Sequence, residues 1–330
     1  MTRFIARRLL ILPLLLILVN FLSYTYAFYA RPLRAERTPY VAVEDPGELI
    51  PSYINYLAMV FDFDFSMELA VPGSLRTNTP NTMGEVIRNA TIASLGLLAV
   101  TLTLSSIIGF FMGRKAVQNE SNRVARWLSI VTTMGLAMPS FYVGSILIFI
   151  SVAYILWRGP GSDSPFPLDG FGWDLHLVLP VAALMARPTV QLAQVTANFL
   201  SGELGKQYVI AARSLGYTWR SIRSQYALKN ILAPVILTIA GLSRLIFGEQ
   251  ILIEWLFRWP GLGRLLAWTL VPAQLSSSKG SPLFLNPPVM ATIITIIAAI
   301  FLLSDLFGSI MVRVVDPRLR NPETEVIDRK

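Results

Sequence analysis

Five charged residues stand inside or at the edge of the long apolar segments of this sequence, and they raise the first question about its chemistry. They are Arg187, Arg244, Glu249, Glu254 and Asp305. A charge at membrane depth is costly, so each is expected to line a polar pathway or to pair with a charge on another helix. In one interpretation Arg187, Arg244 and Glu249 face a wet cavity that passes a charged or zwitterionic substrate. In the other they form interhelical ion pairs that fix a helix bundle.

The sequence lacks the groups that metal, thiol or triad catalysis needs. It has no cysteine and one histidine, His176, which alone can build neither a zinc site nor a Ser-His-Asp triad. No phosphate loop of the form G-x-x-x-x-G-K-[ST] is present, so any ATP must be used by a partner. We predict no catalytic residues, no metal and no cofactor, and a membrane-embedded enzyme is the least favoured alternative.

Composition places these charges in an integral membrane protein. Hydrophobic residues make up 54% of the chain, charged residues 15%, and the mean hydropathy is +0.56. Six apolar segments are long enough to cross a hydrocarbon core of about 30 Å. They cover residues 9–29, 91–112, 127–157, 175–199, 231–257 and 289–312. The sequence therefore predicts an all-α membrane protein with six transmembrane helices. A cleaved signal peptide at the start is the weaker alternative, because its apolar part would be shorter.

The cations predict the orientation of these helices. Seventeen of them fall in four segments, 3–8, 114–126, 206–229 and 313–330, whereas the alternate segments hold nine. Cytoplasmic segments carry the excess of lysine and arginine, so both termini are expected in the cytoplasm. The net charge of +8 is explained in this way, and nucleic-acid binding is not favoured.

Residues 205–230, here called the basic loop, are a polar island between the fourth and fifth apolar segments. We expect a first short helix to end near Leu215 and Gly216 to turn the chain in the left-handed conformation. Thr218 is expected to cap a second helix, and Pro234 to lie in the first turn of the next transmembrane helix. Such a loop suits docking to a soluble partner.

The basic loop resembles the cytoplasmic coupling loop of binding-protein-dependent ABC permeases. The general motif is E-A-A-x-x-x-G, and here Ala211, Ala212 and Gly216 match while Ile210 replaces the glutamate, which the peptide-transporter branch usually lacks. The resemblance implies that the loop packs into a groove of an ATPase subunit. The residues implied in this contact are Tyr208, Ala211, Ala212, Arg213, Gly216, Arg220, Arg223 and Lys229.

Further motifs of the same family occur along the chain. Met138-Pro139-Ser140-Phe141 resembles its Ile-Pro-Ser-Phe, and a kink of the third helix is expected there. Glu254 to Gly263 resembles a conserved outer loop of the family, with Pro260, Gly261 and Gly263 in a tight turn, and Asp316 to Arg320 resembles its end. Structural roles are implied for Pro139, Glu254, Pro260, Gly261, Gly263 and Asp316. Trp255, Trp259 and Trp268 are expected to anchor at the membrane interface.

Two local departures and one aromatic stretch complete the resemblance. Glu249 stands where the family usually has a small residue, and Asp305 stands where its peptide branch often has asparagine. The stretch Val60 to Phe65 resembles a family element ahead of the second helix, and it is equally typical of an interfacial aromatic element.

The resemblance covers most of the chain and implies a permease subunit with a type I ABC importer fold. It implies as partners a second, homologous permease, two cytoplasmic ATPases, an extracytoplasmic substrate-binding protein and membrane lipid. The expected cargo is a di- or oligopeptide, with an oligosaccharide or a nickel chelate as alternatives, in a bacterial or archaeal cell membrane. An ion-coupled secondary transporter would instead use Arg187, Arg244, Glu249 and Asp305 as a relay, but we see no repeat of two halves.

The expected domain division follows from these assignments. Residues 1–30 form the first transmembrane helix and 31–90 an extracytoplasmic segment. Residues 91–312 form the core permease domain, with five transmembrane helices and the coupling loop 205–230. Residues 313–330 form a cytoplasmic tail.

Overall fold

A computed structural model describes residues 2–35, 47–70, 81–118, 123–159, 162–271 and 281–315. Residues 316–330 of the predicted tail lie outside the described residues, so the structural role expected for Asp316 stays a prediction. The helices are α1 Thr2–Ala35, α2 Leu49–Phe61, α3 Met83–Ala116, α4 Arg126–Ala137, α5 Ser140–Arg158, α6 Val178–Leu204, α7 Gln207–Ser214, α8 Trp219–Ser221, α9 Leu228–Leu256, α10 Leu262–Leu270 and α11 Pro287–Val315.

Six helical stretches of the described chain are long and apolar enough to cross a membrane, which confirms the predicted all-α fold. They are Arg8–Arg34, Met83–Ala116, Ser140–Arg158, Leu175–Leu204, Trp219–Leu256 and Pro287–Met311. The chain divides into two compact units, described separately below. The first holds residues 97–257 and the end of α11 from Leu303, and the second holds residues 2–96 and 258–302.

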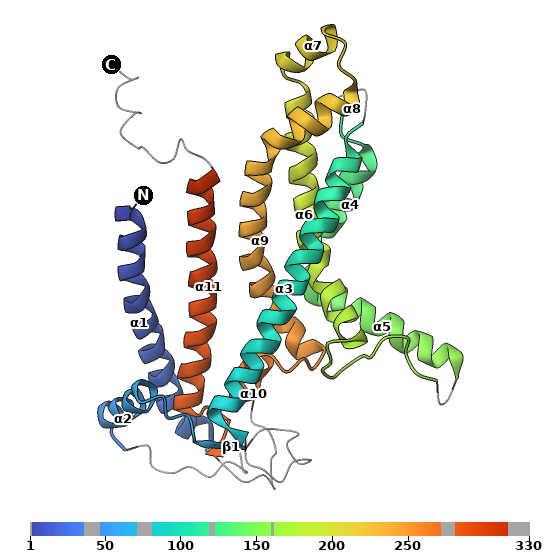
Figure 1. Cartoon of the computed structure of the whole chain (residues 1–330). Helices are drawn as coiled ribbons and strands as arrows, with labels where there is room; N and C mark the ends of the chain where they lie inside the picture. The colour runs from blue at the N-terminus through green and yellow to red at the C-terminus, as the bar shows by residue number, and fades with distance from the viewer. Residues whose placement is uncertain are drawn as a thin grey trace. The chain divides into compact units, whose positions relative to one another are not determined.

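In the first unit, α6 is the central helix, with α9, α5 and α4 packed against it (Figure 1). Two glycines of α3 permit a further close contact with α6. A Cβ added at Gly109 would meet the Thr189 carbonyl oxygen at 2.7 Å, and one at Gly113 would collide with the carbonyl oxygen of Ala193. The spacing Gly109-Phe-Phe-Met-Gly113 is the small-xxx-small pattern that lets membrane helices approach closely.

The third predicted span is broken where a kink was expected. Its helix stops at Ala137, and a new one, α5, begins at Ser140, with Met138 and Pro139 in extended conformation between them. A residue before proline is pushed out of the helical region, which explains the stop at Met138. The prediction of one 31-residue span is therefore wrong. Only α5 is long enough to span, and it leaves α4 at a wide angle (Figure 1).

The second unit contains a small three-stranded sheet of order β2-β1-β3, built from β1 Glu68–Ala70, β2 Asn81–Thr82 and β3 Ser281–Pro282. Strand β1 pairs antiparallel with β2 and parallel with β3. Buried apolar residues from the start of α3, from α10 and from the start of α11 pack beside it, among them Met83, Leu262 and Val289.

The predicted tight turn at residues 260–263 is present in this unit, where the Gly261 amide donates to the Trp259 carbonyl at 2.8 Å. Trp259 itself was expected to be an interface anchor, and this is wrong. Its side chain is fully buried and its indole N–H donates to the Ala93 carbonyl at 3.1 Å. A buried indole needs such a partner, so Trp259 is a core residue of the second unit.

Candidate functional site

The basic loop has the geometry that its sequence predicts at the turn. Helix α7 ends at Ser214, Gly216 has φ +87°, and the Thr218 hydroxyl accepts a hydrogen bond from the Ser221 amide at 3.3 Å. A positive φ is a conformation that residues with a Cβ rarely adopt. Gly216 therefore lets the chain reverse between α7 and α8, as expected.

The path after α8 differs from the prediction. Helix α8 continues without a break through a π-helical segment, η3 Ile222–Ala227, into α9. Pro234 thus lies inside α9 beyond its first turn, and the expected separate start of a transmembrane helix near Pro234 is wrong. Hydrogen bonds in a π-helix span five residues instead of four, and such segments are frequent at functional sites.

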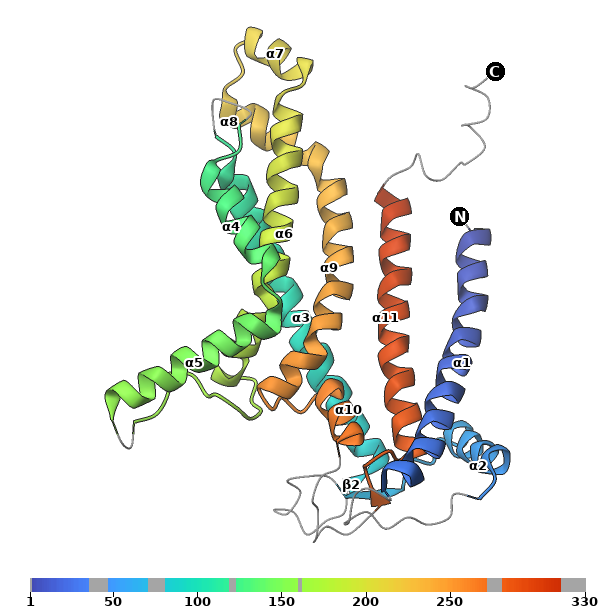
Figure 2. The ribbon, with the colours of Figure 1, turned by 180° about the vertical axis from the view of Figure 1, so that it is seen from behind.

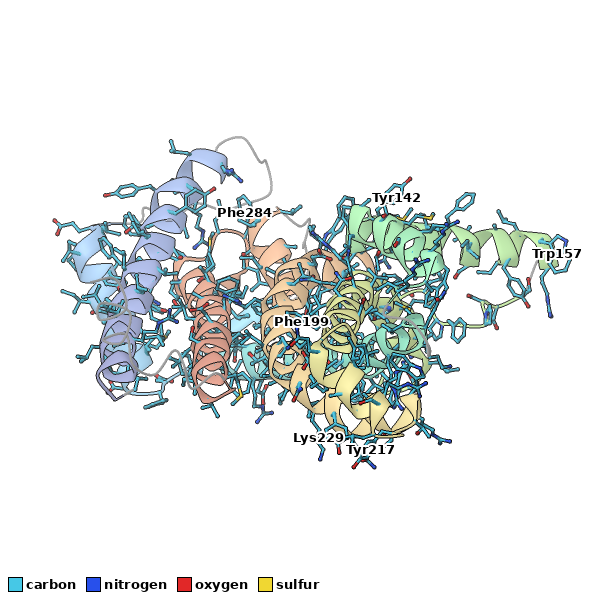
Figure 3. The ribbon with its side chains drawn as sticks, turned by 90° about the horizontal axis from the view of Figure 1, so that it is seen from above. Tyr142, Trp157, Phe199, Tyr217, Lys229 and Phe284 are labelled. Atoms are coloured by element: carbon cyan, nitrogen blue, oxygen red, sulfur yellow. The ribbon has the colours of Figure 1, made fainter. Side chains whose placement is uncertain are left out.

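The basic loop presents a mixed apolar and cationic surface. Ile210 and Leu215 are 70% and 77% exposed, and Tyr217 and Tyr226 are also exposed. Among the predicted docking residues, Ala211, Arg213, Gly216, Arg220 and Lys229 are exposed, whereas Tyr208, Ala212 and Arg223 are half-buried. Viewed along the bundle, Tyr217 and Lys229 project outward from the loop (Figure 3). The Arg213 guanidinium lies over the Trp219 ring at 5.2 Å, which braces α7 against α8.

A residue that sequence reasoning missed lies at the base of this loop. Glu203, near the end of α6, is buried, and its carboxylate accepts three bonds. The Lys206 ammonium lies at 2.5 Å, the Asn230 amide at 2.7 Å and the Tyr208 hydroxyl at 3.2 Å. Burial, followed by the neighbouring Glu203 charge, raises the pKa of Tyr208 to about 12. One carboxylate thus joins α6, α7 and α9 where the loop begins and ends.

Arg223 does not point outward, although it was assigned to the docking surface. Its guanidinium donates to the carbonyl of Val117 at 3.3 Å and to the carbonyl of Arg114. The Arg114 carbonyl belongs to the last turn of α3, and Val117 directly follows that helix. Cations are favourable there because the last carbonyls of a helix have no intrahelical partner. Arg223 therefore links the π-helical segment to α3.

The charges within the spans form ion pairs between helices. An Arg187 nitrogen of α6 lies 2.8 Å from one carboxylate oxygen of Glu249 on α9, and the other oxygen accepts the Ser140 amide at 3.3 Å. Glu249 therefore caps α5 at the break after Pro139 while it neutralises Arg187. The two side chains are 37% and 19% exposed.

The second pair joins α9 to α11. An Arg244 nitrogen lies 2.5 Å from an Asp305 oxygen, and these side chains are 42% and 34% exposed. Arg244 does not pair with Glu249, its neighbour in sequence. Of the two interpretations of the span charges, interhelical pairing is the one that the described residues form.

Glu254 lies inside the last turn of α9, where it is 1% exposed and accepts a hydrogen bond from Gln250 at 2.7 Å. Within the described part of the chain, no group of three or more histidine or acidic side chains is placed to hold a metal ion. His176 pairs instead with Asp174 at 2.6 Å, and hydrogen bonds from His176 lower the pKa of the Asp174 carboxyl.

Comparison with known proteins identifies relatives over the whole length. A sequence model of the family described as "Binding-protein-dependent transport system inner membrane component" matches residues 105–321. The oligopeptide transport system permease protein AppB of Bacillus subtilis is 25% identical over 97% of this chain and 99% of its own length. The dipeptide transport system permease protein DppB of Lactococcus lactis is 25% identical over 81% and 80%, and a putative peptide transport system permease protein of Brucella abortus is 28% identical over 69% and 68%.

Proposed function

We propose that this chain forms half of the translocation pathway of a peptide importer. The family model matches more than half of the chain, so the chain belongs to the inner membrane components of binding-protein-dependent transport systems. It is a multi-pass permease with six candidate transmembrane helices. The proposed cargo is a di- or oligopeptide, which the names of the relatives AppB and DppB support. Oligosaccharides and nickel chelates remain the alternatives within the same role.

The basic loop carries the proposal for coupling to ATP. Its exposed Ile210 and Leu215 stand among the exposed cations Arg213, Arg220 and Lys229. An apolar centre with a polar rim is the composition of a protein–protein contact. We assign this surface to a cytoplasmic ATPase subunit, with Ala211, Ala212 and Gly216 giving the close approach.

Two buried contacts are proposed to transmit motion from the loop to the spans. Glu203 ties the loop to α6 and α9, and Arg223 ties it to α3. A push on α7 and α8 is therefore delivered to three long helices at once. Without the Glu203 and Arg223 contacts, the loop could move relative to the spans, and its motion would not be transmitted to them.

The ion pairs are proposed to border the pathway. Arg187, Arg244 and Glu249 keep partly exposed side chains at membrane depth, and contact of a charge with lipid is costly. We propose that the exposed sides of these pairs face either the passing substrate or the second, homologous permease subunit. Structural roles are proposed for Pro139, Glu254, Pro260, Gly261 and Gly263.

The complete importer is proposed to contain this chain, the second permease, two ATPases and an extracytoplasmic binding protein. Both termini and the tail from residue 313 are assigned to the cytoplasm of a bacterial cell, and residues 31–90 to the outside, because this places the cation-rich segments inside. The division into residues 1–30, 31–90 and 91–312 is retained as part of the proposal.

Reconstitution of the whole complex tests this function. Proteoliposomes with the ATPase sites inside and the binding protein outside are expected to take up a labelled dipeptide or oligopeptide only when ATP is enclosed. Uptake driven by an ion gradient without ATPase subunits would instead establish the secondary transporter. ATP-dependent uptake of nickel chelate or oligosaccharide, with peptide excluded, would keep the ABC role and replace the cargo.

A further inference from the structure

Helix α2 is an apolar helix within residues 31–90, the segment expected to be extracytoplasmic. Its 13 residues, LIPSYINYLAMVF, contain no charged side chain, whereas Glu48 precedes it and Asp62 follows it. An apolar stretch of about 10–14 residues is too short to span a membrane and is typical of buried or interfacial helices. Helix α2 lies crosswise beside α1, as both side views show (Figures 1 and 2).

One face of α2 is fixed to the spans by neutral hydrogen bonds. Tyr53 and Tyr56 are buried, and their hydroxyls meet Asn20 of α1 at 3.1 and 2.9 Å. The Tyr56 hydroxyl also lies 3.1 Å from that of Thr292 in α11. Thr292 is five residues into α11, or about 7.5 Å along it at a rise of 1.5 Å per residue. Helix α2 is therefore held within the first two turns of a membrane-spanning helix.

A second face of α2 is apolar and mostly exposed in the described chain. Ile50, Ile54 and Phe61 are 56%, 57% and 75% exposed. They form one stripe, because steps of about 100° per residue place them within about 40° of one another. Met59, about 180° from Ile50 by the same count, packs against the apolar cluster beside the small sheet.

We propose that α2 is an interfacial helix whose Ile50–Ile54–Phe61 stripe is covered by the acyl chains of the membrane leaflet next to it. The stripe points away from the apolar cluster that Met59 contacts, and the tyrosine face of α2 hydrogen-bonds to two spans. Its length of 13 apolar residues fits a helix that lies at the membrane boundary without crossing the membrane. In the proposed orientation this is the outer leaflet.

We take the molecule that covers the Ile50–Ile54–Phe61 stripe to be lipid because of the position of α2 along the spanning helices. Its hydrogen-bonding partners lie on candidate spans, one of them in the second turn of α11, so a stripe at this level meets the membrane before it meets water. No charged side chain rims the stripe within α2, because the acids Glu48 and Asp62 stand beyond its two ends. This placement goes beyond the transport function and would hold whatever the cargo is.

Site-directed spin labelling tests the proposal, since the chain has no native cysteine. The complete importer is reconstituted in proteoliposomes with one cysteine, Ile54→Cys, and with Asn55→Cys as the matched control. Asn55 is also exposed and adjacent in sequence but lies about 100° away around the helix. We expect the label at position 54 to favour collision with oxygen over a water-soluble nickel chelate by several-fold, and the label at 55 to show the reverse.

Equal access of the nickel chelate to both labels would overturn the proposal. So would a label at position 54 that is shielded from both reagents and becomes accessible when the binding protein or the second permease is omitted, because a protein would then cover the stripe. Phe61→Cys gives a second reading on the same stripe if Ile54→Cys fails to assemble. Transport by the labelled importer is measured separately, so loss of the membrane placement and loss of the transport function are distinguishable.

Discussion

Helices α6 and α9 are joined twice, and the two junctions differ in kind. Near the basic loop, Glu203 of α6 accepts bonds from Lys206, Tyr208 and Asn230. Sixteen residues earlier on α6, about 24 Å away by helical rise, Arg187 meets Glu249 of α9, which also caps α5. The bonded residues of the first junction are 3, 5 and 27 positions apart in sequence, whereas those of the second are 62 and 109 apart.

This difference shows how one helix pair can be held together at one end and still transmit motion at the other. The Glu203 junction consists of one ion pair, whose Lys206 side chain is 59% exposed, and two hydrogen bonds, and these can be exchanged one at a time as the loop moves. The Glu249 junction opposes two full charges at membrane depth, and parting them is costly. We propose that the Glu249 junction fixes the bundle and the Glu203 junction carries the coupling.

The largest effect is expected from breaking the Glu249 junction on one side. Glu249→Gln leaves Arg187 without its counter-charge and weakens the cap on α5. One-sided removal costs about 3–5 kcal/mol in a buried pair, and partial exposure places this one near about 3 kcal/mol. The free energy of unfolding of the assembled complex, from titration with SDS, is the measurement. The double variant Arg187→Gln, Glu249→Gln should recover more than half, and no recovery would refute the pairing as the cause.

The Glu203 junction can be tested by exchanging the acceptor Glu203 and the donor Asn230. Asn230→Asp alone sets a second carboxylate against Glu203 and should cost about 2 kcal/mol, in the range for hydrogen bonds to charged groups. The cost should appear as faster amide exchange in residues 205–230 and weaker substrate-stimulated ATP hydrolysis, with the spans still protected.

Adding Glu203→Gln to Asn230→Asp restores a donor and an acceptor with their positions reversed. The double variant should therefore recover ATP hydrolysis, while Lys206 keeps a carboxylate nearby. If the double variant stays as uncoupled as Asn230→Asp, Glu203 does not position the loop through Asn230.

A smaller effect is expected at the turn of the loop. Gly216→Val forces a β-branched residue into a positive φ, at a cost of about 1–2 kcal/mol, and should weaken coupled ATP hydrolysis. Gly202→Val is the matched control, because both glycines have open space where a Cβ would stand but only Gly216 has a positive φ. Equal activity of the two variants would show that the turn is not needed for coupling.

The smallest effect is expected from alkaline titration of Tyr208. Its pKa is raised from 10.0 to about 12, so its contribution to the folded loop is complete below pH 10 and is lost as the pH rises through 12. Amide protection of residues 205–230 should fall over this window. Tyr208→Phe cannot ionise and should lack that fall, measured by pulsed exchange. An identical fall in the variant would assign it to another group.

Features carried by a single stretch of sequence were predictable. The number of spans, the turn at Gly216 and the cap at Thr218 each follow from a local rule of hydropathy or backbone geometry. The kink expected at Pro139 has such a rule too, although the structure there shows a full break between two helices. The close contact at Gly109 and Gly113 also has a local signal, the small-xxx-small spacing, which would have found it.

Features that need two distant segments were not predictable from the residues alone. That Glu249 meets Arg187, and Arg244 meets Asp305, depends on which faces of α6, α9 and α11 are apposed. Glu203 offered only the weak signal of an acid three residues before Lys206. The inward turn of Arg223 had no signal, because its carbonyl partners at the end of α3 belong to the backbone.

The π-helical segment between α8 and α9 sets the rotational orientation of the preceding part of the basic loop about the axis of α9. Residues 222–227 wind more slowly than an α-helix, so everything before them is rotated relative to an uninterrupted helix. Deleting one residue there would straighten the winding and swing the loop by about 100°, the angle of one residue. The same side chains would then face another direction. The rotation set by residues 222–227 is therefore as important for binding a partner as the side chains themselves.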